Sequence, residues 1–362
     1  MDRRFKIIDL FAGPGGLDLA ARQLDIPAHG IEWDGGACAT REANGLGTSP
    51  GDVRHFGPGD FQDANVLAGG PPCQTFTVAG HGSGRRALDQ VLAFADRFAA
   101  GESIEDIEAD LGNLEDPRTG LVLEPLRWTL EAIREKRPFE VIVLEQVPAV
   151  LPVWQKYAEL LRREGYFVAD PKVLHTEEFG VPQTRRRAIF MARLRESFSS
   201  EPQLPTPTHK RFNPRKSARA ERMLDETPLL PTGETLPEPV AMREALPGRT
   251  EPFVVVSNYG TGGDPKARGR RFSHEPSATV TGKVSRNRVE ALDGTDLPRF
   301  TLHEMGQLQT FPADGDWTWA GKDVSQQIGN AVPPRLGMHV LAAALGITKE
   351  ELDAAIRKYY RY

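Results

Sequence analysis

The sequence contains little cysteine, since Cys38 and Cys73 are the two cysteines among 362 residues. They lie far apart and without a secretory context, so we expect no disulfide framework. We expect instead that the protein resides in a reducing cytoplasm. No apolar run is long enough to cross a membrane, and the first residues lead directly into a predicted strand without a signal-peptide pattern. The eight histidines show no metal-ligand spacing. We therefore expect a cytoplasmic protein that holds no metal and meets no membrane.

A strong positive charge is also missing, because the formal net charge is −5. Any contact with nucleic acid must therefore come from local patches. Residues 195–298 supply them, with 16 Lys and Arg against 14 Asp and Glu in a stretch rich in Pro and Gly. Basic residues cluster there at 210–211, 215–216, 268–271 and 283–288, among turn residues, as is typical of loops that contact a phosphate backbone. This stretch predicts a separate, irregular, mostly β domain.

The most informative stretch runs from Val66 to Cys73. A short apolar run predicts a buried strand, Gly69 and Gly70 allow a sharp turn, and two prolines stiffen the backbone after that turn. The thiol of Cys73 is thus predicted on a rigid loop beyond the carboxyl end of a strand, where open α/β sheets place their ligands. Such a thiol suits nucleophilic attack as a thiolate. A half-buried structural cysteine in a Gly-Pro turn is the alternative.

Near the N-terminus, a strand over 5–11, a glycine-rich turn over 12–16 and a helix from Leu17 predict the first unit of a nucleotide-binding α/β sheet. The spacing is not that of a phosphate P-loop. A second strand over 28–31 ends at Glu32, an acid placed to accept hydrogen bonds from ribose hydroxyls. Trp33 could pack on an adenine face. Taken alone, a tight connection followed by a core Trp and a solvated Glu explains the same residues.

Further along, the chain alternates between helical and strand patterns. The pattern predicts a glycine-hinged basic loop over 79–86, of the kind that closes over substrates. Helices are predicted over 87–113, through 123–133 and over 153–164. Strands are predicted over 141–144, where the strand is buried, and over 166–174. The buried strand ends in Glu145, which we expect in the same crevice as Cys73. Arg185 and Arg187 alternate before a strand over 188–192, and this spacing puts both on one face. A helix over 336–345 follows later.

These motifs, in this order, resemble the DNA (cytosine-5)-methyltransferases of bacteria. Residues 9–16 look like the S-adenosylmethionine loop of that family, and Gly70-Pro71-Pro72-Cys73-Gln74 looks like its nucleophile motif. The pattern Gln183-x-Arg185-x-Arg187, the stretch 299–312 and Gln327-x-Gly329-Asn330 match later motifs. The resemblance covers nearly all of the chain except the variable middle.

The resemblance implies a Rossmann-like α/β fold of the S-adenosylmethionine-dependent methyltransferase type, a mixed sheet with helices on both faces, plus a smaller, irregular, mostly β target-recognition domain. It divides the chain into a catalytic domain over 1–193, a target-recognition domain over 194–300 and a return segment over 301–362 that completes the first. The expected cofactor is S-adenosylmethionine, with S-adenosylhomocysteine as product. The expected partner is double-stranded DNA, with a cognate restriction or defence component as a further candidate, and the protein is expected to be a monomer.

The resemblance also assigns roles to residues. Cys73 would attack C6 of a flipped-out cytosine, Glu145 would bind or protonate N3, and Arg187 would contact O2 with Arg185 nearby. The residues that it assigns to the cofactor are Asp9, Phe11, Ala12, Gly13, Gly15, Gly16, Leu17, Glu32, Trp33, Asp52, Val53, Pro71, Leu121, Asn330 and Ala331. The residues assigned to DNA are Gln74, Thr77, Arg85, Arg86, Arg268, Arg270, Arg271, Arg286 and Arg288.

The chain departs from the family pattern in two places. The family has Glu-Asn-Val where this chain has Glu145-Gln146-Val147, and that Asn is thought to brace the nucleophile loop. About thirty residues also intervene between the nucleophile loop and Asp116, which is long for a connection. We expect this insertion to alter loop closure or to contact DNA, so that deleting residues 88–112 would affect DNA binding or turnover more than cofactor affinity.

Three rival functions make different demands on the sequence. A zinc-dependent nucleobase deaminase also uses a Pro-Cys motif and a Glu, but it needs Cys-x-x-Cys, and Phe76 stands third after Cys73. A tRNA cytosine-5 methyltransferase of the same fold is closer, although the sizeable middle domain with basic loops favours DNA. A non-catalytic DNA-binding relative would be expected to have lost the nucleophile, whereas Cys73, Glu145 and Arg187 are all present.

Overall fold

The computed structural model describes residues 5–72, 83–111, 117–214, 236–260 and 268–362. Within these ranges the main sheet has eight strands in the order β3-β2-β1-β4-β5-β9-β6, and β7 also pairs with β9. The strands of this sheet are β1 Ile7–Leu10, β2 Ala28–Glu32, β3 Gly47–Pro50, β4 Val66–Gly69, β5 Val141–Gln146, β6 Tyr166–Val168, β7 Lys172–His175 and β9 Arg186–Leu194. Strands β1 to β5 run parallel to their neighbours, and β9 is antiparallel to β5.

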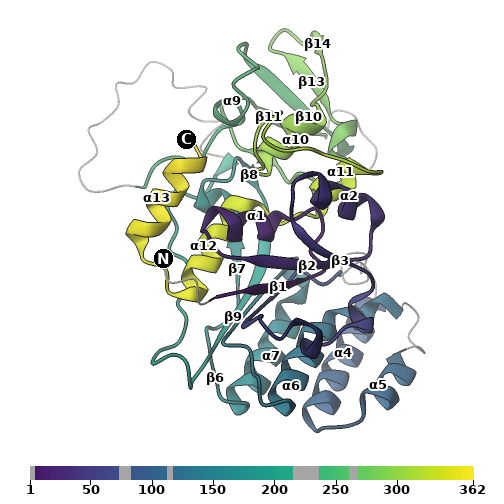
Figure 1. Cartoon of the computed structure of the whole chain (residues 1–362). Helices are drawn as coiled ribbons and strands as arrows, with labels where there is room; N and C mark the ends of the chain where they lie inside the picture. The colour runs from purple at the N-terminus through teal and green to yellow at the C-terminus, as the bar shows by residue number, and fades with distance from the viewer. Residues whose placement is uncertain (1–4, 73–82, 112–116, 215–235, 261–267) are drawn as a thin grey trace.

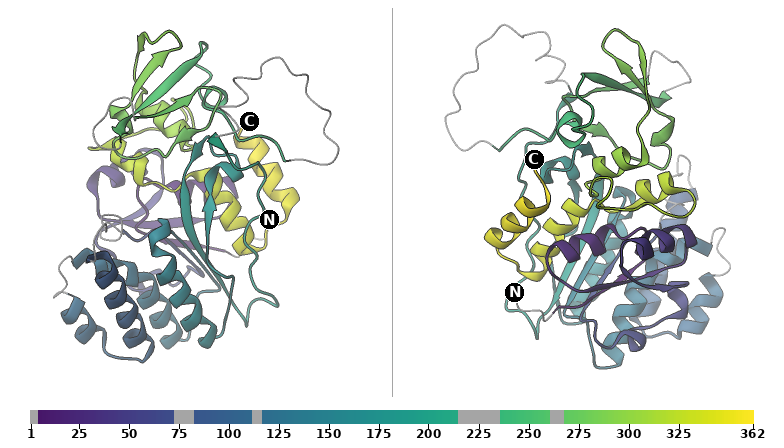
Figure 2. Two further views of the ribbon diagram at one scale, coloured as in Figure 1. Left: turned by 180° about the vertical axis from the view of Figure 1, so that it is seen from behind. Right: turned by 45° about the horizontal axis from the view of Figure 1, so that its top comes forward.

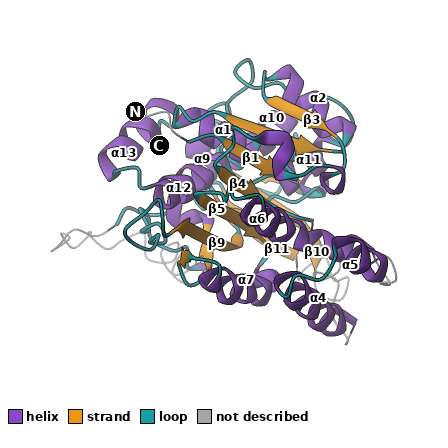
Figure 3. Ribbon diagram, turned by 60° about the horizontal axis from the view of Figure 1, so that its bottom comes forward, coloured by secondary structure: helices purple, strands orange, loops and turns teal. Residues whose placement is uncertain are grey.

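The central strands are buried and mostly apolar because helices cover both faces of the sheet, with Asp9 in β1 and Glu145 in β5 among the polar exceptions. Helices α1 (Gly16–Gln23) and α12 (Pro334–Leu345) pack on one face, and α13 (Lys349–Tyr359) follows α12 (Figures 1 and 3). On the other face lie α4 (Ser83–Ala99), α5 (Ile104–Leu111), α6 (Glu124–Arg134) and α7 (Leu151–Arg163). A Cβ on Gly337 would come within 2.8 Å of the Ala20 Cβ, so α12 approaches α1 closely.

A second, smaller sheet lies beyond the carboxyl edge of the main one (Figure 2). Its antiparallel strands follow the order β11-β10-β13-β14, with β10 Phe253–Gly260, β11 Arg268–Phe272, β13 Arg288–Ala291 and β14 Asp296–Leu297. Two short strands, β8 (Gln183–Thr184) and β12 (Ser277–Ala278), pair in parallel and join this part to the rest. The remaining helices are α2 Gly35–Ala43, α9 Met242–Ala245, α10 Leu302–Leu308 and α11 Val324–Asn330.

Short 3-10 helices connect several of these elements, at Val53–His55, Pro58–Phe61, Pro117–Leu123, Pro148–Val150, Thr176–Phe179 and Val284–Arg286. No helix in the described ranges is both long and apolar enough to span a membrane. The mixed sheet covered on both faces, with a smaller antiparallel sheet beside it, confirms the predicted fold class.

Three local predictions differ from the structure. The strand predicted over 166–174 is two strands, β6 and β7, because Pro171 lies between them and offers no N–H for a sheet ladder. Strand β3 escaped prediction, since its sequence Gly-Thr-Ser-Pro has poor strand propensity and sits at the sheet edge. The predicted basic loop ends early, because α4 begins at Ser83 and takes in Arg85 and Arg86, while residues 79–82 lie outside the described ranges.

The segment expected to act on the loop or on DNA is part of the main core. Val91, Ala95, Phe98 and Ile107 are buried in the cluster that packs α4 and α5 against α6 and α7. Deleting residues 88–112 would therefore remove core side chains, and a loss of activity would report on folding before it reported on DNA.

Candidate active site

A large cavity opens where the parallel strands end. The chain leaves β1 toward β2 and β3 on one side, and returns to β4 and β5 on the other, so the order of the sheet reverses between β1 and β4. Ligands of open α/β sheets bind at such a reversal. The cavity measures about 1090 Å³ and is lined by residues that follow β1, β2, β4 and β5, together with residues of the return segment. Its volume suits a nucleoside-sized ligand and a further group beside it.

Most residues predicted to hold the cofactor line this cavity, although they come from five separate stretches of sequence. They are Asp9, Phe11, Ala12, Gly13, Gly16, Leu17, Glu32, Trp33, Asp52, Val53, Leu121, Asn330 and Ala331. Gly15 and Pro71 are outside the lining. Gly15 instead gives space to neighbouring side chains, because a Cβ there would lie 2.2 Å from Leu46 Cδ1.

The turn after β1 has an unusual backbone. Phe11 has a φ of 61°, Gly13 of 54° and Gly15 of 99°, so three of five consecutive residues are left-handed. A non-glycine residue in this region costs about 1 kcal/mol, and such strain gathers at functional sites. A Cβ on Gly13 would meet nothing within 4 Å, which leaves its backbone open to the cavity.

The Glu32 carboxylate is fixed by backbone N–H groups. Its Oε2 accepts from Gly13 N (2.7 Å), and its Oε1 accepts from Trp33 N (3.0 Å) and Asp34 N (2.8 Å). Burial raises the pKa of Glu32, and the hydrogen bonds from these N–H groups lower it in part. Trp33 beside it is 70% exposed at the cavity wall, so it is not the core Trp of the alternative interpretation. Oε1 thus accepts two hydrogen bonds, whereas Oε2 accepts one and retains capacity to accept from a ligand hydroxyl.

A buried ion pair between Asp18 and Arg41 holds the start of α1, the helix that follows the glycine turn. Arg41 Nη1 and Nη2 donate to the two carboxylate oxygens of Asp18 at 2.8 Å each, and both side chains are at most 1% exposed. The same guanidinium reaches Gly47 O and Thr48 Oγ1, so it ties α1 and α2 to the edge strand. Burial, and after it the charge of Asp18, raises the pKa of Asp9 at the cavity floor.

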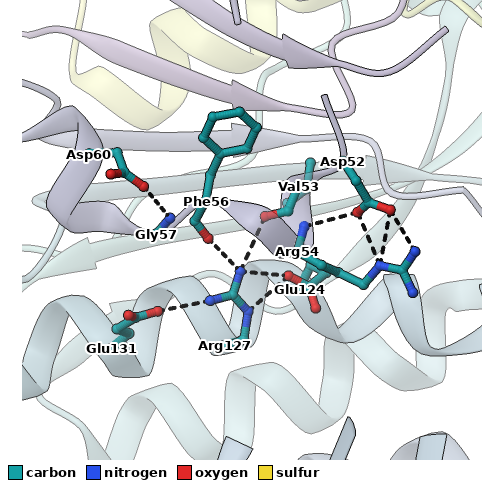
Figure 4. A network of polar contacts seen from close by, with 9 residues as sticks. All are labelled: Asp52, Val53, Arg54, Phe56, Gly57, Asp60, Glu124, Arg127 and Glu131. Carbon is teal, nitrogen blue, oxygen red and sulfur yellow. Dashed lines mark hydrogen bonds and ion pairs between the residues drawn. The ribbon is translucent and has the colours of Figure 1, made fainter. Parts of the chain in front are cut away.

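Asp52 begins the 3-10 helix Val53–His55 at the far wall (Figure 4). Its carboxylate accepts from Arg54 N at 3.0 Å and pairs with the Arg54 guanidinium at 2.5 Å. These contacts, with the Arg54 side chain first, lower the pKa of Asp52 and keep it ionised. Asp52, which the resemblance assigns to the cofactor, is thus an anchored anion on the cavity wall.

Glu145 and Arg187 meet inside the cavity. Glu145 ends β5 and Arg187 lies in the antiparallel neighbour β9, and Arg187 Nε lies 2.5 Å from Glu145 Oε1. Their side chains are 11% and 12% exposed. Burial lowers the pKa of Arg187, and the Glu145 carboxylate opposes this. The pair therefore places a carboxylate and a guanidinium side by side in a mostly dry site.

The loop that leads to Cys73 starts beside Glu145. A Cβ on Gly70 would lie 3.6 Å from Glu145 Oε2, and Pro72 lines the cavity. Gln146 Nε2 donates to Pro71 O, and Gln146 Oε1 accepts from Val147 N. The longer side chain thus braces the backbone at the start of this loop. Cys73, Gln74 and Thr77 lie outside the described residues.

Arg185 occupies a different environment from Arg187. It is 1% exposed, does not line the cavity, and donates to the carbonyls of Val280, Gly329 and Ala331 at 3.0 to 3.2 Å. Burial lowers its pKa, and no carboxylate is bonded to it. Arg185 therefore joins the start of β9 to the smaller sheet and to the return segment. The structure does not bring the two arginines together at the cavity.

The return segment closes the cavity against α2. Thr40 Oγ1 donates to Gln327 Oε1 (2.7 Å), and Gln327 Nε2 donates to Ala320 O and Lys322 O. At the other end of α11, a Cβ on Gly329 would lie 2.2 Å from Gly282 N, so the smaller sheet's loop packs directly on this helix. Gln327 and Gly282 both line the cavity and were not predicted as site residues.

The predicted DNA-binding arginines fall into three groups. Arg286 lines the cavity mouth together with Lys283. Arg270 and Arg288 are half-exposed and both pair with Glu290, and Arg271 lies over the Phe212 ring. The side chains of Arg85, Arg86 and Arg268 are not described. The Arg270 pair forms across β11, β10 and β13 and had no sequence signal, whereas Arg288 and Glu290 are two residues apart on β13.

The described residues contain no cluster of three or more His, Cys, Asp or Glu side chains suited to a metal. Cys38 lies in α2 and is half-buried, with its thiol 3.3 Å from Glu32 O.

A family model for C-5 cytosine-specific DNA methylases matches residues 5–95 and 111–345. The chain belongs to this family, which confirms the predicted resemblance and the predicted enzyme class, a DNA (cytosine-5)-methyltransferase. The unmatched residues 96–110 cover the end of α4 and nearly all of α5. These residues lie within the stretch predicted to be an insertion.

Two type II methyltransferases are similar to this protein over nearly the whole chain. The type II methyltransferase M1.HphI of Haemophilus parahaemolyticus is 28% identical over 377 residues, covering 95% of this chain and 87% of that protein. M.PspPI of Psychrobacter sp., also a type II methyltransferase, is 26% identical over 357 residues, covering 93% and 78%. Among solved structures, the Dnmt2 methyltransferase of S. pombe has a TM-score of 0.57 at 15% identity, covering 94% of this chain and 98% of that one. The latter likeness concerns the fold alone.

Proposed function

We propose that this protein transfers a methyl group from S-adenosylmethionine to C5 of a flipped-out cytosine in duplex DNA, through a transient bond between Cys73 and C6. The observation that carries the proposal is the Glu145–Arg187 pair. It lies in one cavity with Pro72 and with the wall formed by Gly13 and Glu32. We call the part lined by Gly13, Glu32 and Asp52 the cofactor side, and the part lined by Glu145 and Arg187 the base side.

The residues of the cofactor side fit S-adenosylmethionine. Gly13 leaves open space, the Glu32 carboxylate retains capacity for ribose hydroxyls, and Trp33 offers an exposed aromatic face. When bound, this cofactor supplies an electrophilic methyl group to the reaction. Glu32, Trp33 and Asp52 would hold its adenosine part, and Asn330 and Ala331 would close the cavity over it.

On the base side the residues divide the work of activating cytosine, whose C5 is a poor nucleophile. The Cys73 thiolate forms a bond to C6, and the C5–C6 π electrons move toward N3 and O2. Glu145 holds a proton at N3 and Arg187 stabilises negative charge at O2. After C5 has taken the methyl group, loss of its proton restores the C5–C6 double bond, and sulfur leaves C6 with its electron pair. We assign Arg185 to support of β9 and not to the base.

The test is methyl transfer by Cys73→Ala, measured with radiolabelled S-adenosylmethionine and unmethylated genomic DNA. We expect loss of turnover while calorimetric binding of S-adenosylhomocysteine is kept. As a second readout, the unaltered protein should form a denaturation-resistant complex with DNA containing 5-fluorocytosine, because fluorine blocks the final loss of the C5 proton. Full turnover by Cys73→Ala would refute the assignment.

The type II relatives favour a restriction-modification setting, in which methylation protects a short sequence from a partner nuclease. Bisulfite sequencing of DNA from cells that express the protein would reveal that sequence. A tRNA substrate is the rival, and parallel assays on duplex DNA and on tRNA decide between them. Arg286 and Lys283 at the cavity mouth lie where a phosphate backbone would pass.

A further inference from the structure

Arg127 lies behind the cofactor side and does not line the cavity. It projects from α6, is 5% exposed, and uses all three of its nitrogens (Figure 4). Nε donates to Glu124 Oε2 and Nη1 to Glu131 Oε2, each at 2.9 Å. The remaining nitrogen, Nη2, donates to two backbone carbonyls, Phe56 O at 2.8 Å and Val53 O at 3.3 Å.

These two carbonyls lie at the ends of the turn that forms the far wall of the cavity. Val53 O accepts from Phe56 N at 3.2 Å, which closes the 3-10 helix, and Asp52 caps its start. Asp52, Val53 and Arg54 line the cavity from this turn. Nη2 of Arg127 thus binds this turn from the side opposite the cavity, while residues of the same turn line the cofactor side.

The turn is also held at two other points, since Gly51 N donates to Glu32 O at 2.9 Å just before it and Val53 is buried in the main core. The turn follows β3, the edge strand, which pairs with β2 on one side. Arg127 couples it to α6, whose Leu126, Trp128 and Leu130 are buried in the main core. Glu124 Oε2 lies 2.9 Å from both Nε and Nη2, and Glu131 Oε2 accepts from Nη1, so the two carboxylates fix the plane of the guanidinium and direct Nη2 toward the carbonyls. A lysine ammonium has no such fork and reproduces neither the spacing nor the aim.

We propose that Arg127 is a positioning residue for the cofactor: it sets the affinity for S-adenosylmethionine by fixing the turn Val53–His55, without touching the ligand. The proposal rests on the proposed function, because it takes the cofactor side to be the S-adenosylmethionine site. It assigns to Arg127 an effect on cofactor binding and none on the chemistry at Glu145 and Arg187.

The test compares Arg127→Lys with Arg134→Lys. Arg134 lies on the same helix, is exposed and donates to Phe98 O, away from the turn, so it controls for an Arg-to-Lys change on α6 that does not reach the turn. Calorimetry gives the affinity for S-adenosylhomocysteine, and initial rates on unmethylated genomic DNA give KM for S-adenosylmethionine and kcat. We expect Arg127→Lys to weaken binding and raise KM by about tenfold or more, with kcat at saturating cofactor within about twofold. Arg134→Lys should match the unaltered protein.

A purely structural role predicts a different result. Arg127→Lys would then unfold at a lower temperature, yet its folded form would bind S-adenosylhomocysteine as tightly as the unaltered protein, and that outcome overturns the proposal. Hydrogen exchange adds a local readout, since peptides spanning residues 51–57 should exchange faster in Arg127→Lys, while those from α7 should not. If Arg127→Lys fails to fold, Glu131→Ala removes one carboxylate from a partly exposed position, and about threefold weaker binding is expected; unchanged binding would overturn the proposal.

Failure of the proposed function is distinguishable. If the unaltered protein does not bind S-adenosylhomocysteine, both proposals fall. If it binds and Arg127→Lys binds equally well, only the role of Arg127 is lost.

Discussion

The cofactor side and the base side are built from the ends of neighbouring parallel strands, yet their charged groups are placed differently. Behind the cofactor side, Asp18–Arg41 and Glu124–Arg127 are buried outside the lining, and they fix the backbone that carries Gly13 and Asp52. On the base side the pair Glu145–Arg187 stands in the cavity itself. Both sides thus present charge to the cavity, Glu32 and Asp52 on one and Glu145 with Arg187 on the other, and the cofactor side has two further ion pairs buried behind its wall.

The largest expected effect is a loss of unfolding free energy in Asp18→Asn, which breaks the buried ion pair behind the cofactor side. This change leaves the Arg41 guanidinium buried without its carboxylate partner, and breaking a buried pair costs about 3–5 kcal/mol of unfolding free energy. Urea unfolding measures it. Asp63→Asn is the matched control, because its pair with Lys6 is exposed and should be worth less than about 1 kcal/mol. Equal effects of the two changes would contradict the comparison.

A pH-dependent effect is expected at Glu177, which lies outside the cavity lining. Burial raises the pKa of Glu177 to about 7, and this residue sits in the 3-10 helix Thr176–Phe179, whose Thr176 bonds to Gln183 and Arg185. The folded state keeps the proton up to about pH 7, whereas an unfolded chain loses it near 4.5. The unfolding free energy should therefore fall as the pH rises between these values.

Glu177→Gln should remove this slope and raise the unfolding free energy at pH 8 by about 1–3 kcal/mol. Urea unfolding at pH 5 and pH 8 provides the measurement, and Glu159→Gln, on an exposed face of α7, provides the control. A slope that survives in Glu177→Gln would place the titrating group elsewhere.

The smallest effect is expected at Gln146→Asn, which restores the residue that the family has at this position. The shorter side chain cannot span the same distance to Pro71 O, and losing this hydrogen bond costs about 1 kcal/mol. Because this hydrogen bond braces the loop that leads to Cys73, we expect turnover to drop about fivefold, with unchanged affinity for S-adenosylhomocysteine. Weaker cofactor binding with normal turnover would instead assign Gln146 to the cofactor side.

Much of the site could be predicted because its residues sit at strand ends that the local pattern marks. The glycine turn, Glu32 and Glu145 each follow a short apolar run, and parallel strands bring such ends to one edge. Arg41 and Arg127 could not be predicted, because their partners are set by packing between helices. Arg185 was assigned to the cavity from the alternation with Arg187 and from the family resemblance. The bridge β8–β12 turns it instead toward the carbonyls of Val280 and Gly329.

The hydrogen bond between Thr40 and Gln327 joins residues 287 positions apart and helps to close the cavity. A nascent chain on the ribosome therefore has its glycine turn and its acids long before it has Asn330 and Ala331. Cofactor capture has to wait until this late segment has emerged and docked on α2, so an incompletely synthesised chain has no closed site in which to modify a genome.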